Sequence, residues 1–193
     1  MDNRLIHFLF VFLVFCAANA HAEEEQPYTF SPPGCEFSAT LPSEPAISKR
    51  CPETAKAGCY DVAKYVKVYD YNATINFEFS CNLITEDIRA AYNKETIEAV
   101  LTSAVRRKGV DEVPQIFYNE PKSGDTTYKI AAVSGIRKAG VTEKLYIHQL
   151  WIGEKSLMLI DAELSEASHI EADKTFAEIL KSVHIVGDEE EEE

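Results

Sequence analysis

Residues 35–81 read CEFSATLPSEPAISKRCPETAKAGCYDVAKYVKVYDYNATINFEFSC, and they contain four of the five cysteines of the chain. The second half of this segment alternates with a period of two residues. This is typical of β-strands, because successive side chains point to opposite faces of a sheet. Residues 59–71 place valines on one face and tyrosines on the other: Val62, Val66 and Val68 against Tyr65, Tyr69 and Tyr71. The return strand has apolar residues at alternate positions: Ala73, Ile75, Phe77, Phe79 and Cys81. The sequence therefore predicts a β-hairpin with Asn72 at its tip.

Two shorter strands precede this hairpin in the prediction. Residues 34–41 alternate small or apolar residues with polar ones, and residues 46–51 continue after a break. The break is the segment Pro42-Ser43-Glu44-Pro45, because proline has no N–H to donate and fixes φ. Residues 35–81 are thus expected to form four successive strands, with a loop over residues 52–58.

The four cysteines in this segment, Cys35, Cys51, Cys59 and Cys81, allow three pairings, and the sequence alone does not choose among them. We favour Cys51–Cys59, which closes a short loop, together with Cys35–Cys81, which ties the first strand to the fourth. The alternative is Cys35–Cys51 with Cys59–Cys81. A four-thiolate zinc site is disfavoured, because no Cys-x-x-Cys pair is present and the expected compartment is oxidising.

That compartment follows from residues 1–22, which are typical of a signal peptide. Arg4 gives a basic start, an apolar run at residues 8–18 is too short to span a bilayer, and Ala20-His21-Ala22 fits a small-x-small cleavage site. We expect cleavage after Ala22, with cleavage before His21 as the alternative. Cys16 then leaves with the leader. Lipid modification of Cys16 is disfavoured by the bulky Phe15 before it. The chain is expected to be periplasmic or secreted.

The formal net charge of the chain is −13, and nine acidic residues lie in Glu23–Glu25 and in residues 188–193. We expect an N-terminal arm (23–33), one disulfide-linked domain (34–187) and a disordered acidic tail (188–193). Nucleic acid is an unfavourable partner, because binding of phosphates needs a basic surface. A floppy acidic run does not provide the ordered oxygens of a tight Ca²⁺ site. After the leader no segment is apolar enough for a membrane span, so we do not expect an integral membrane protein.

Residues 85–108 have apolar residues at helical spacing, with Thr85 as a cap and Gly109 as a stop, and they predict one helix. The basic triplet Arg106-Arg107-Lys108 complements the helix dipole, a reading we prefer to an anion site. Further strands are predicted over residues 113–118, 126–137, 143–152 and 156–164. A last helix begins at Ser165 or Ser168, and its expected buried stripe is Ile170, Phe176, Ala177, Leu180 and Val183. The fold class is α+β: a largely antiparallel sheet with two helices packed on it.

Three short segments carry a resemblance to a known fold. They are the early strand and turn at residues 37–42, the mid-chain helix at residues 85–108, and the ending Phe176-Ala177-Glu178-Ile179-Leu180-Lys181-Ser182-Val183. In these segments the chain resembles the PsbP-like fold family, and DcrB-type bacterial envelope proteins within it. The resemblance implies an α/β/α sandwich that binds or helps to assemble other proteins. It implies no catalytic residues, and the two disulfides are not a general feature of that family.

Motifs of common enzymes are absent from the sequence, including Gly-x-Ser-x-Gly and His-Glu-x-x-His, and no cofactor or metal is expected. One acid–base cluster is conceivable: His148 on its strand faces Asp161 and Glu163 on the next, if Gly153 and Glu154 form the turn. We prefer to interpret His148 as a partly exposed histidine with a hydrogen-bonded carboxylate, and we assign no catalytic residue.

Aromatic residues suggest a contact surface, because they are enriched at interfaces. The candidates are Tyr65, Tyr69, Tyr71, His148 and Trp151. We interpret the chain as a non-enzymatic binding or assembly module of the cell envelope, whose partner is another envelope protein. The alternatives are a carrier of a small apolar ligand, and a hydrolase that uses His148 with Asp161.

Overall fold

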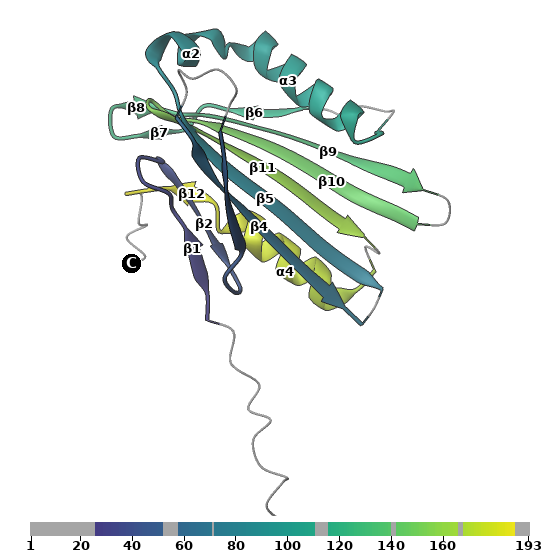
Figure 1. Ribbon diagram of the computed structural model, residues 1–193. Coiled ribbons are helices and arrows are strands. Elements are labelled where there is room, and N and C mark those ends of the chain that lie inside the picture. Colours follow the sequence, from purple (N-terminus) through teal and green to yellow (C-terminus); the bar gives the residue numbers. More distant parts are fainter. Residues whose placement is uncertain are drawn as a thin grey trace, which may run out of the picture.

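The structure is a computed structural model that describes residues 26–51, 58–70, 72–110, 116–139, 142–165 and 168–187 (Figure 1). Its main sheet is antiparallel, with the strand order β3-β4-β5-β11-β10-β9-β6. These strands are β3 (Ala46–Arg50), β4 (Tyr60–Tyr69), β5 (Ala73–Leu83), β6 (Phe117–Asn119), β9 (Lys129–Ala139), β10 (Thr142–Ile152) and β11 (Ser156–Ser165). The other elements are β1 (Tyr28–Phe30), β2 (Phe37–Leu41), β12 (His184–Ile185), β7 (Lys122–Ser123), β8 (Thr126–Thr127), α2 (Glu86–Ala91), α3 (Lys94–Arg107) and α4 (Ile170–Lys181). The predicted leader and acidic tail lie outside the described residues.

The predicted hairpin is the pair β4–β5, and its alternation is as expected. Val62 pairs with Ser80 and Tyr65 with Phe77, so the valines and the tyrosines of β4 lie on opposite faces of the sheet. The turn brings the N–H of Asn72 within 3.0 Å of the carbonyl oxygen of Tyr69. Tyr71 lies outside the described residues. The hairpin β10–β11 was also predicted, and it is the centre of the sheet.

Both favoured disulfides are confirmed. Cys35 pairs with Cys81, and Cys51 pairs with Cys59. The first bridge joins the chain just before β2 to the end of β5, so it ties the small sheet to the main one. The second bridge joins the end of β3 to the start of β4, and therefore holds the outermost hairpin of the sheet together.

The first of the four predicted strands forms, but it does not join the main sheet. β2 pairs with β1 on one side and with β12 on the other. Residues 23–33 were expected to be an N-terminal arm outside the domain, but residues 28–30 form β1 of the small sheet. The physical reason is burial: Phe30 on β1 is only 3% exposed and Leu41 on β2 is fully buried, so both strands contribute to the core.

The single helix predicted over residues 85–108 is two helices, α2 and α3. Thr85 caps α2 as expected, since its Oγ1 accepts the N–H of Ile88. The break comes at Asn93, whose side chain accepts the N–H of Thr96 at 2.8 Å and starts a second helix. An asparagine cap satisfies an N–H that has no partner within the helix, so it competes with continuation of α2. Gly109, with φ 77°, ends α3 as predicted.

The last helix begins later than predicted, and its buried residues are Ala172, Phe176 and Ile179, while the expected Ala177 and Leu180 are only partly buried. His169 precedes α4, and its Nδ1 accepts the N–H of Ala172 at 3.3 Å. Ile170 was expected to be buried but is 80% exposed, because the first turn of α4 points this residue away from the sheet. Phe176 and Val183 are buried as expected.

The two long helices pack on opposite faces of the main sheet (Figure 1). On the α4 face, alternate residues of β5 and β11 form one apolar core with α4 and the small sheet; its largest members include Phe37, Phe77, Phe79 and Phe176. On the α3 face, a smaller core lies beneath α3 and includes Ile97, Leu101, Tyr146, Leu150 and Ile152. The described residues are therefore α+β with a mostly antiparallel sheet, but they contain three helices where two were predicted, and a small sheet shares one face with α4.

Candidate functional site

The predicted pair His148 and Asp161 is formed at the centre of the sheet. The two residues are direct partners in the β10–β11 register. Nδ1 of His148 donates to Oδ1 of Asp161 at 2.6 Å, and the hydroxyl of Tyr146 donates to the same oxygen. One carboxylate oxygen thus accepts from two side chains of the neighbouring strand.

The period of the strand explains how this cluster forms. Tyr146 and His148 are two residues apart on β10, so both project to the α3 face. Tyr146 is 2% exposed and belongs to the core beneath α3, and His148 is 6% exposed, so it is buried where a partly exposed histidine was expected. Asp161 is less buried, with about a third of its side chain exposed. The cluster therefore sits at the boundary between the covered and the open part of this face.

Its electrostatics keep Asp161 ionised. Burial alone raises the pKa of Asp161, but the hydrogen bond and the electrostatic interaction with His148, with contributions from Tyr146 and Lys108, outweigh it and lower the pKa below its ordinary 3.8. The pKa of Tyr146 is raised far above its ordinary 10, first by burial and then by its bond to Asp161. Tyr146 consequently stays a hydrogen-bond donor at neutral pH.

The end of α3 supplies the next contacts. Nζ of Lys108 donates to Oε1 of Glu163 at 2.8 Å and lies 5.1 Å from the ring centre of Tyr146. The basic triplet at the end of α3 therefore does more than complement the helix dipole. It places one ammonium group over the aromatic ring and beside the second carboxylate of β11.

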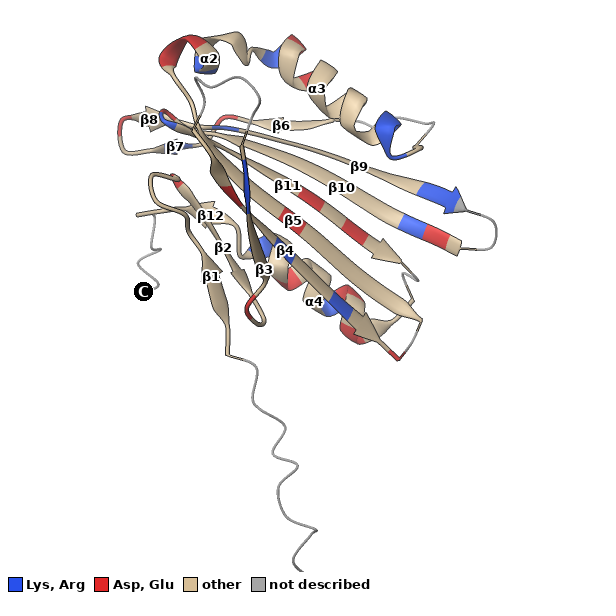
Figure 2. Cartoon of the chain, in the orientation of Figure 1, with Lys and Arg blue, Asp and Glu red and all other residues tan. Residues whose placement is uncertain are grey.

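Beyond the edge of α3, the face stays polar across four strands. We call this region the polar face, and define it as Lys64, Val66, Val68, Thr74, Asn76, Glu78, Lys144, Asp161, Glu163 and Ser165. The strand registers place its residues in rows across the sheet. One row runs Lys64–Glu78–Asp161–His148, and the next runs Val66–Asn76–Glu163–Tyr146. Figure 2 shows acidic residues on β5 and β11 with basic residues on β3, β4 and β10 beside them.

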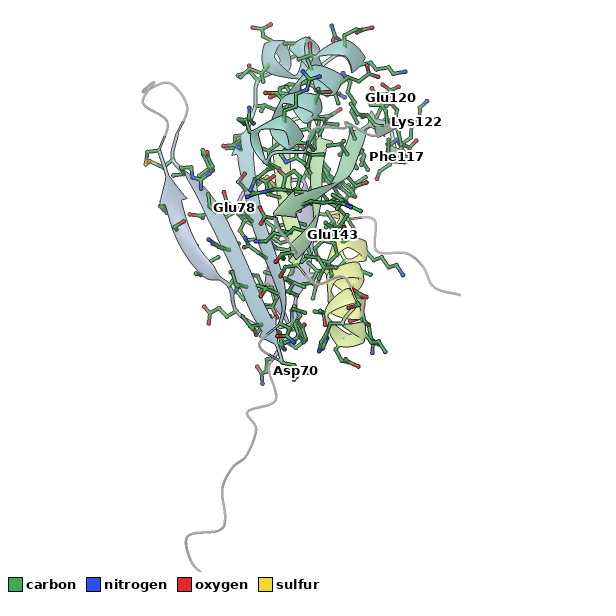
Figure 3. All side chains as sticks on the ribbon, turned by 90° about the vertical axis from the view of Figure 1, so that its right-hand side faces the viewer. Asp70, Glu78, Phe117, Glu120, Lys122 and Glu143 are labelled. Atoms are coloured by element: carbon green, nitrogen blue, oxygen red, sulfur yellow. A yellow bond between two sulfur atoms is a disulfide. The ribbon has the colours of Figure 1, made fainter. Side chains whose placement is uncertain are left out.

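Each carboxylate of the polar face has its own partner. Glu78 and Asp161 are directly opposite each other, an arrangement that is unfavourable for like charges. Glu78 accepts from Arg50 of β3 at 2.8 Å, while Asp161 is bound by His148 and Glu163 by Lys108. In Figure 3, Glu78 lies on the side of the sheet away from α4. The acidic residues are thus compensated within the chain.

The polar face contains a hollow of about 310 Å³. Side chains from four strands line it: Lys64, Val66, Thr74, Asn76, Lys144, Glu163 and Ser165. In the described part of the chain, neither Lys64 nor Lys144 has an ion pair. Oδ1 of Asn76 is shielded from solvent and has no hydrogen-bond partner.

The structure does not gather the five predicted contact residues on one surface. Tyr65 is 4% exposed in the core of the α4 face, and the ring of Tyr69 lies 5.3 Å from that of His169. Trp151 is half-buried on the same face and meets the ring of Phe37 edge-on at 5.7 Å. His148 lies on the opposite face, and Tyr71 is outside the described residues.

Sequence reasoning missed Lys64, Asn76, Glu78 and Lys144 as members of a site. The polar alternation of β5 was visible, but a strand pattern does not say which neighbour lies across from it. The partner of β5 is β11, more than seventy residues away in the chain. Only that pairing brings Glu78 to Asp161 and Asn76 to Glu163.

The partners of His148 define what this arrangement can do chemically. The hydrogen bonds that His148 makes go to Tyr146 and Asp161, and neither is a nucleophile of the serine or cysteine kind. Among the described residues, no cluster of histidine, cysteine and acidic side chains has the geometry for a metal ion. In that same part of the chain, no helix is both long and apolar enough to span a bilayer.

Comparison with known proteins gives a fold. Neither the models of known protein families nor the curated protein sequences match the chain. Among solved structures, it is similar to the solution structure of cyanobacterial PsbP (CyanoP) from Synechocystis sp. PCC 6803, with a TM-score of 0.53 and 9% sequence identity. The match covers 88% of this chain and 97% of that chain. The expected PsbP-like fold is therefore confirmed.

Proposed function

We propose that the chain is a non-enzymatic binding module that contacts another protein of the cell envelope through its polar face. The observation that carries this proposal is the state of the α3 face. Half of it is covered by a helix, while the other half is open and carries an ordered set of charged side chains. Val66 and Val68 add exposed apolar area to it, with 50% and 60% of their surface accessible. A mixed apolar and polar surface of this kind is typical of protein contacts.

The compartment is part of the proposal. Disulfides persist in oxidising environments and are rare in the cytosol. The two bridges of this chain therefore support an extracytoplasmic location. The signal-peptide pattern of residues 1–22, with cleavage after Ala22, supports export to the periplasm or the exterior. Within the PsbP-like fold, we place the chain beside the DcrB-type envelope proteins, on the strength of the short segments at residues 37–42 and 176–183.

A hydrolase that uses His148 and Asp161 is the second candidate, and the 2.6 Å contact between them favours it. Both hydrogen bonds of His148 are made by Nδ1, so a catalytic role would fall to Nε2; against it, His148 is only 6% exposed and a substrate has little access to the ring. His148→Ala decides between the two. Unchanged partner binding and an unchanged phenotype, in a variant that stays folded, would remove the hydrolase. Loss of a hydrolytic activity with partner binding intact would establish it.

The third candidate, a carrier of a small apolar ligand, needs space next to Trp151. The ring of Phe37 contacts that indole edge-on, and Phe37 itself is fully buried and also contacts Tyr128. Packed aromatic rings leave little room for a ligand at this place. The carrier proposal is therefore the weakest of the three.

Site-specific photo-cross-linking tests the main proposal. A photoreactive residue replaces Val68 on the polar face, and in a matched variant it replaces Ile170, which is exposed on the first turn of α4. Both variants are expressed in the source organism and irradiated in intact cells. We expect one discrete adduct from position 68 and none from position 170. The same adducts from both positions, or none from position 68, would reject the polar face as the binding surface.

A further inference from the structure

We infer that the hollow in the polar face binds an extended, acidic segment of the partner protein. This inference rests on the proposed function, and it specifies which chemistry the partner presents. Three features carry it: two lysines without ion pairs, the side-chain amide of Asn76 in the lining, and the spacing between the lysines.

The two lysines make this hollow attractive to acidic groups although the chain as a whole has a net charge of −13. Lys64 is opposite Glu78 in the register, but Glu78 is already bound by Arg50. Lys144 is opposite Ser165 on one side and Arg137 on the other, so no carboxylate faces it directly. Glu163, the carboxylate in the lining of the hollow, is paired with Lys108. The two ammonium groups are therefore available to an incoming ligand.

The spacing of the lysines indicates two separate acidic groups. Lys64 is on β4 and Lys144 is on β10, with β5 and β11 between them. The row of Lys64 meets β10 at His148, and Lys144 is four residues along β10 from that position. With strands about 4.8 Å apart and about 3.3 Å per residue, the two Cα atoms are roughly 20 Å apart. Two lysine side chains reaching about 6 Å each leave a gap that one phosphate does not bridge. Carboxylates two to four positions apart on an extended peptide do bridge it, since alternate residues are about 6.7 Å apart.

The floor of the hollow favours a peptide over other anions. The side-chain amide of Asn76 is part of the lining, and a peptide backbone offers both donors and acceptors to an amide, whereas a lipid phosphate or a sulfate offers only acceptors. The hydroxyl of Ser165 and the side chain of Thr74 lie beside it, and Val66 gives an apolar contact. Because Glu163 is part of the lining, its negative charge further disfavours a compact doubly charged anion such as sulfate.

The test uses two synthetic six-residue peptides with blocked ends and the mature, disulfide-bonded chain. One peptide has glutamate at its second, fourth and sixth positions, and the other has glutamine there. Binding is followed by the amide resonances of the ¹⁵N-labelled protein at low salt. We expect saturable shifts at Lys64, Asn76, Lys144 and Ser165 with the glutamate peptide, and at least tenfold weaker binding of the glutamine peptide. Equal binding of both peptides, or shifts elsewhere on the surface, would overturn the inference.

Variants make the test specific. Lys64→Ala with Lys144→Ala is expected to weaken the glutamate peptide at least tenfold, and Asn76→Ala about threefold. The matched control is Lys174→Ala with Lys181→Ala on α4, which removes two exposed lysines and should leave the affinity unchanged. If the control weakens binding as much as the test pair, general charge attraction explains the result and the inference fails.

The outcomes separate this inference from the proposed function. An adduct from position 68 in cells, without binding of the glutamate peptide, keeps the protein-binding function and rejects the acidic segment. Vesicles with anionic phosphatidylglycerol form a further arm. If these vesicles bind with the same dependence on Lys64 and Lys144 while the peptide does not, the hollow recognises a lipid surface and the acidic segment is rejected; the proposed protein contact is rejected as well if position 68 then gives no adduct.

Discussion

The two faces of the main sheet use the same strands for different purposes. On the α4 face, odd-numbered residues of β5 and even-numbered residues of β11 form a continuous apolar core. On the α3 face, the residues between them are apolar only beneath α3 and polar beyond it. Burial on one face therefore suffices to fix the sheet. The residues between are then free to carry charges that a core would not tolerate.

The largest difference in stability between the two faces is expected when one apolar residue on each face is truncated. Phe77 is fully buried, stacks on Phe79 at 5.7 Å and contacts Phe176 at 4.9 Å. Phe77→Ala should lower the free energy of unfolding by about 3–5 kcal/mol, because it removes buried area and leaves a cavity. Val68→Ala on the exposed face should change it by less than about 0.5 kcal/mol. Denaturant unfolding measures both, and similar losses would show that the polar face is also part of the core.

The two disulfides give the next largest effect. Replacing Cys35 and Cys81 by alanine should cost about 2–4 kcal/mol, because this bridge closes a separation of 46 residues and joins the small sheet to the main sheet. Replacing Cys51 and Cys59, which are 8 residues apart, should cost about 1.5 kcal/mol less by loop-closure entropy. Thermal and denaturant unfolding of the two double variants test this order. A larger loss of unfolding free energy on removing the Cys51–Cys59 bridge would show that the outermost hairpin contributes more to stability than the link between the two sheets.

A third effect lies at the turn where the small sheet meets the β10–β11 hairpin. The carboxylate of Glu36 accepts the backbone N–H groups of Glu154, Lys155 and Ser156, at 2.9, 2.8 and 2.7 Å. A Cβ on Gly153 would occupy the place of this carboxylate. Gly153→Ala and Glu36→Ala should therefore each cost about 1.5–3 kcal/mol, since hydrogen bonds to a charged group are lost. The double variant should lose no more unfolding free energy than either single variant, because both remove the same hydrogen bonds. If the two losses add up in the double variant, this explanation is wrong.

The Glu36 contact also has a predictable pH dependence. Partial burial raises the pKa of Glu36, but the hydrogen bonds from Lys155, Glu154 and Ser156 together outweigh it and lower the pKa from its ordinary 4.5. A lowered pKa in the folded state stabilises the fold above the unfolded value, and this stabilisation is lost as the pH falls through the folded value. The difference in unfolding free energy between the natural chain and Glu36→Ala should be constant from pH 7 to about 5, and shrink below about 4.5. A difference that grows on acidification would contradict this.

The sequence predicted the parts of the molecule that depend on local pattern. The period of two in residues 59–81 gave the hairpin β4–β5, and the short spacing of Cys51 and Cys59 favoured the pairing that the structure has. Local pattern could not show that β2 pairs with β1 and β12, because both partners depend on burial against a distant core. The break at Asn93 was missed since apolar spacing continues across it, and only the capping contact with Thr96 ends one helix and starts the next.

The site follows the same division. His148 and Asp161 could be paired from the sequence, because a short turn fixes the register of β10 against β11. Asn76 and Glu78 could not be joined to them, since β5 reaches β11 only through the tertiary fold. The polar face is therefore a product of sheet order, and the contact residues chosen for their aromatic rings divide between the two faces.

The smallest effect expected is at the ion pair between Arg50 and Glu78, and it tests how far the polar face is independent of stability. Their side chains are 57% and 32% exposed, and pairs of this kind contribute about 0–1 kcal/mol. Glu78→Gln removes the pair but also the like charge opposite Asp161, so the two changes oppose each other. We expect the free energy of unfolding to change by less than about 0.5 kcal/mol, and by less still in 1 M salt, where such charges are screened. Because Lys64 loses its only cross-strand acid in this variant, binding of the glutamate peptide should strengthen. A loss of more than about 2 kcal/mol in stability would instead make Glu78 a structural residue, and the polar face would no longer be the part of the sheet that is free to change.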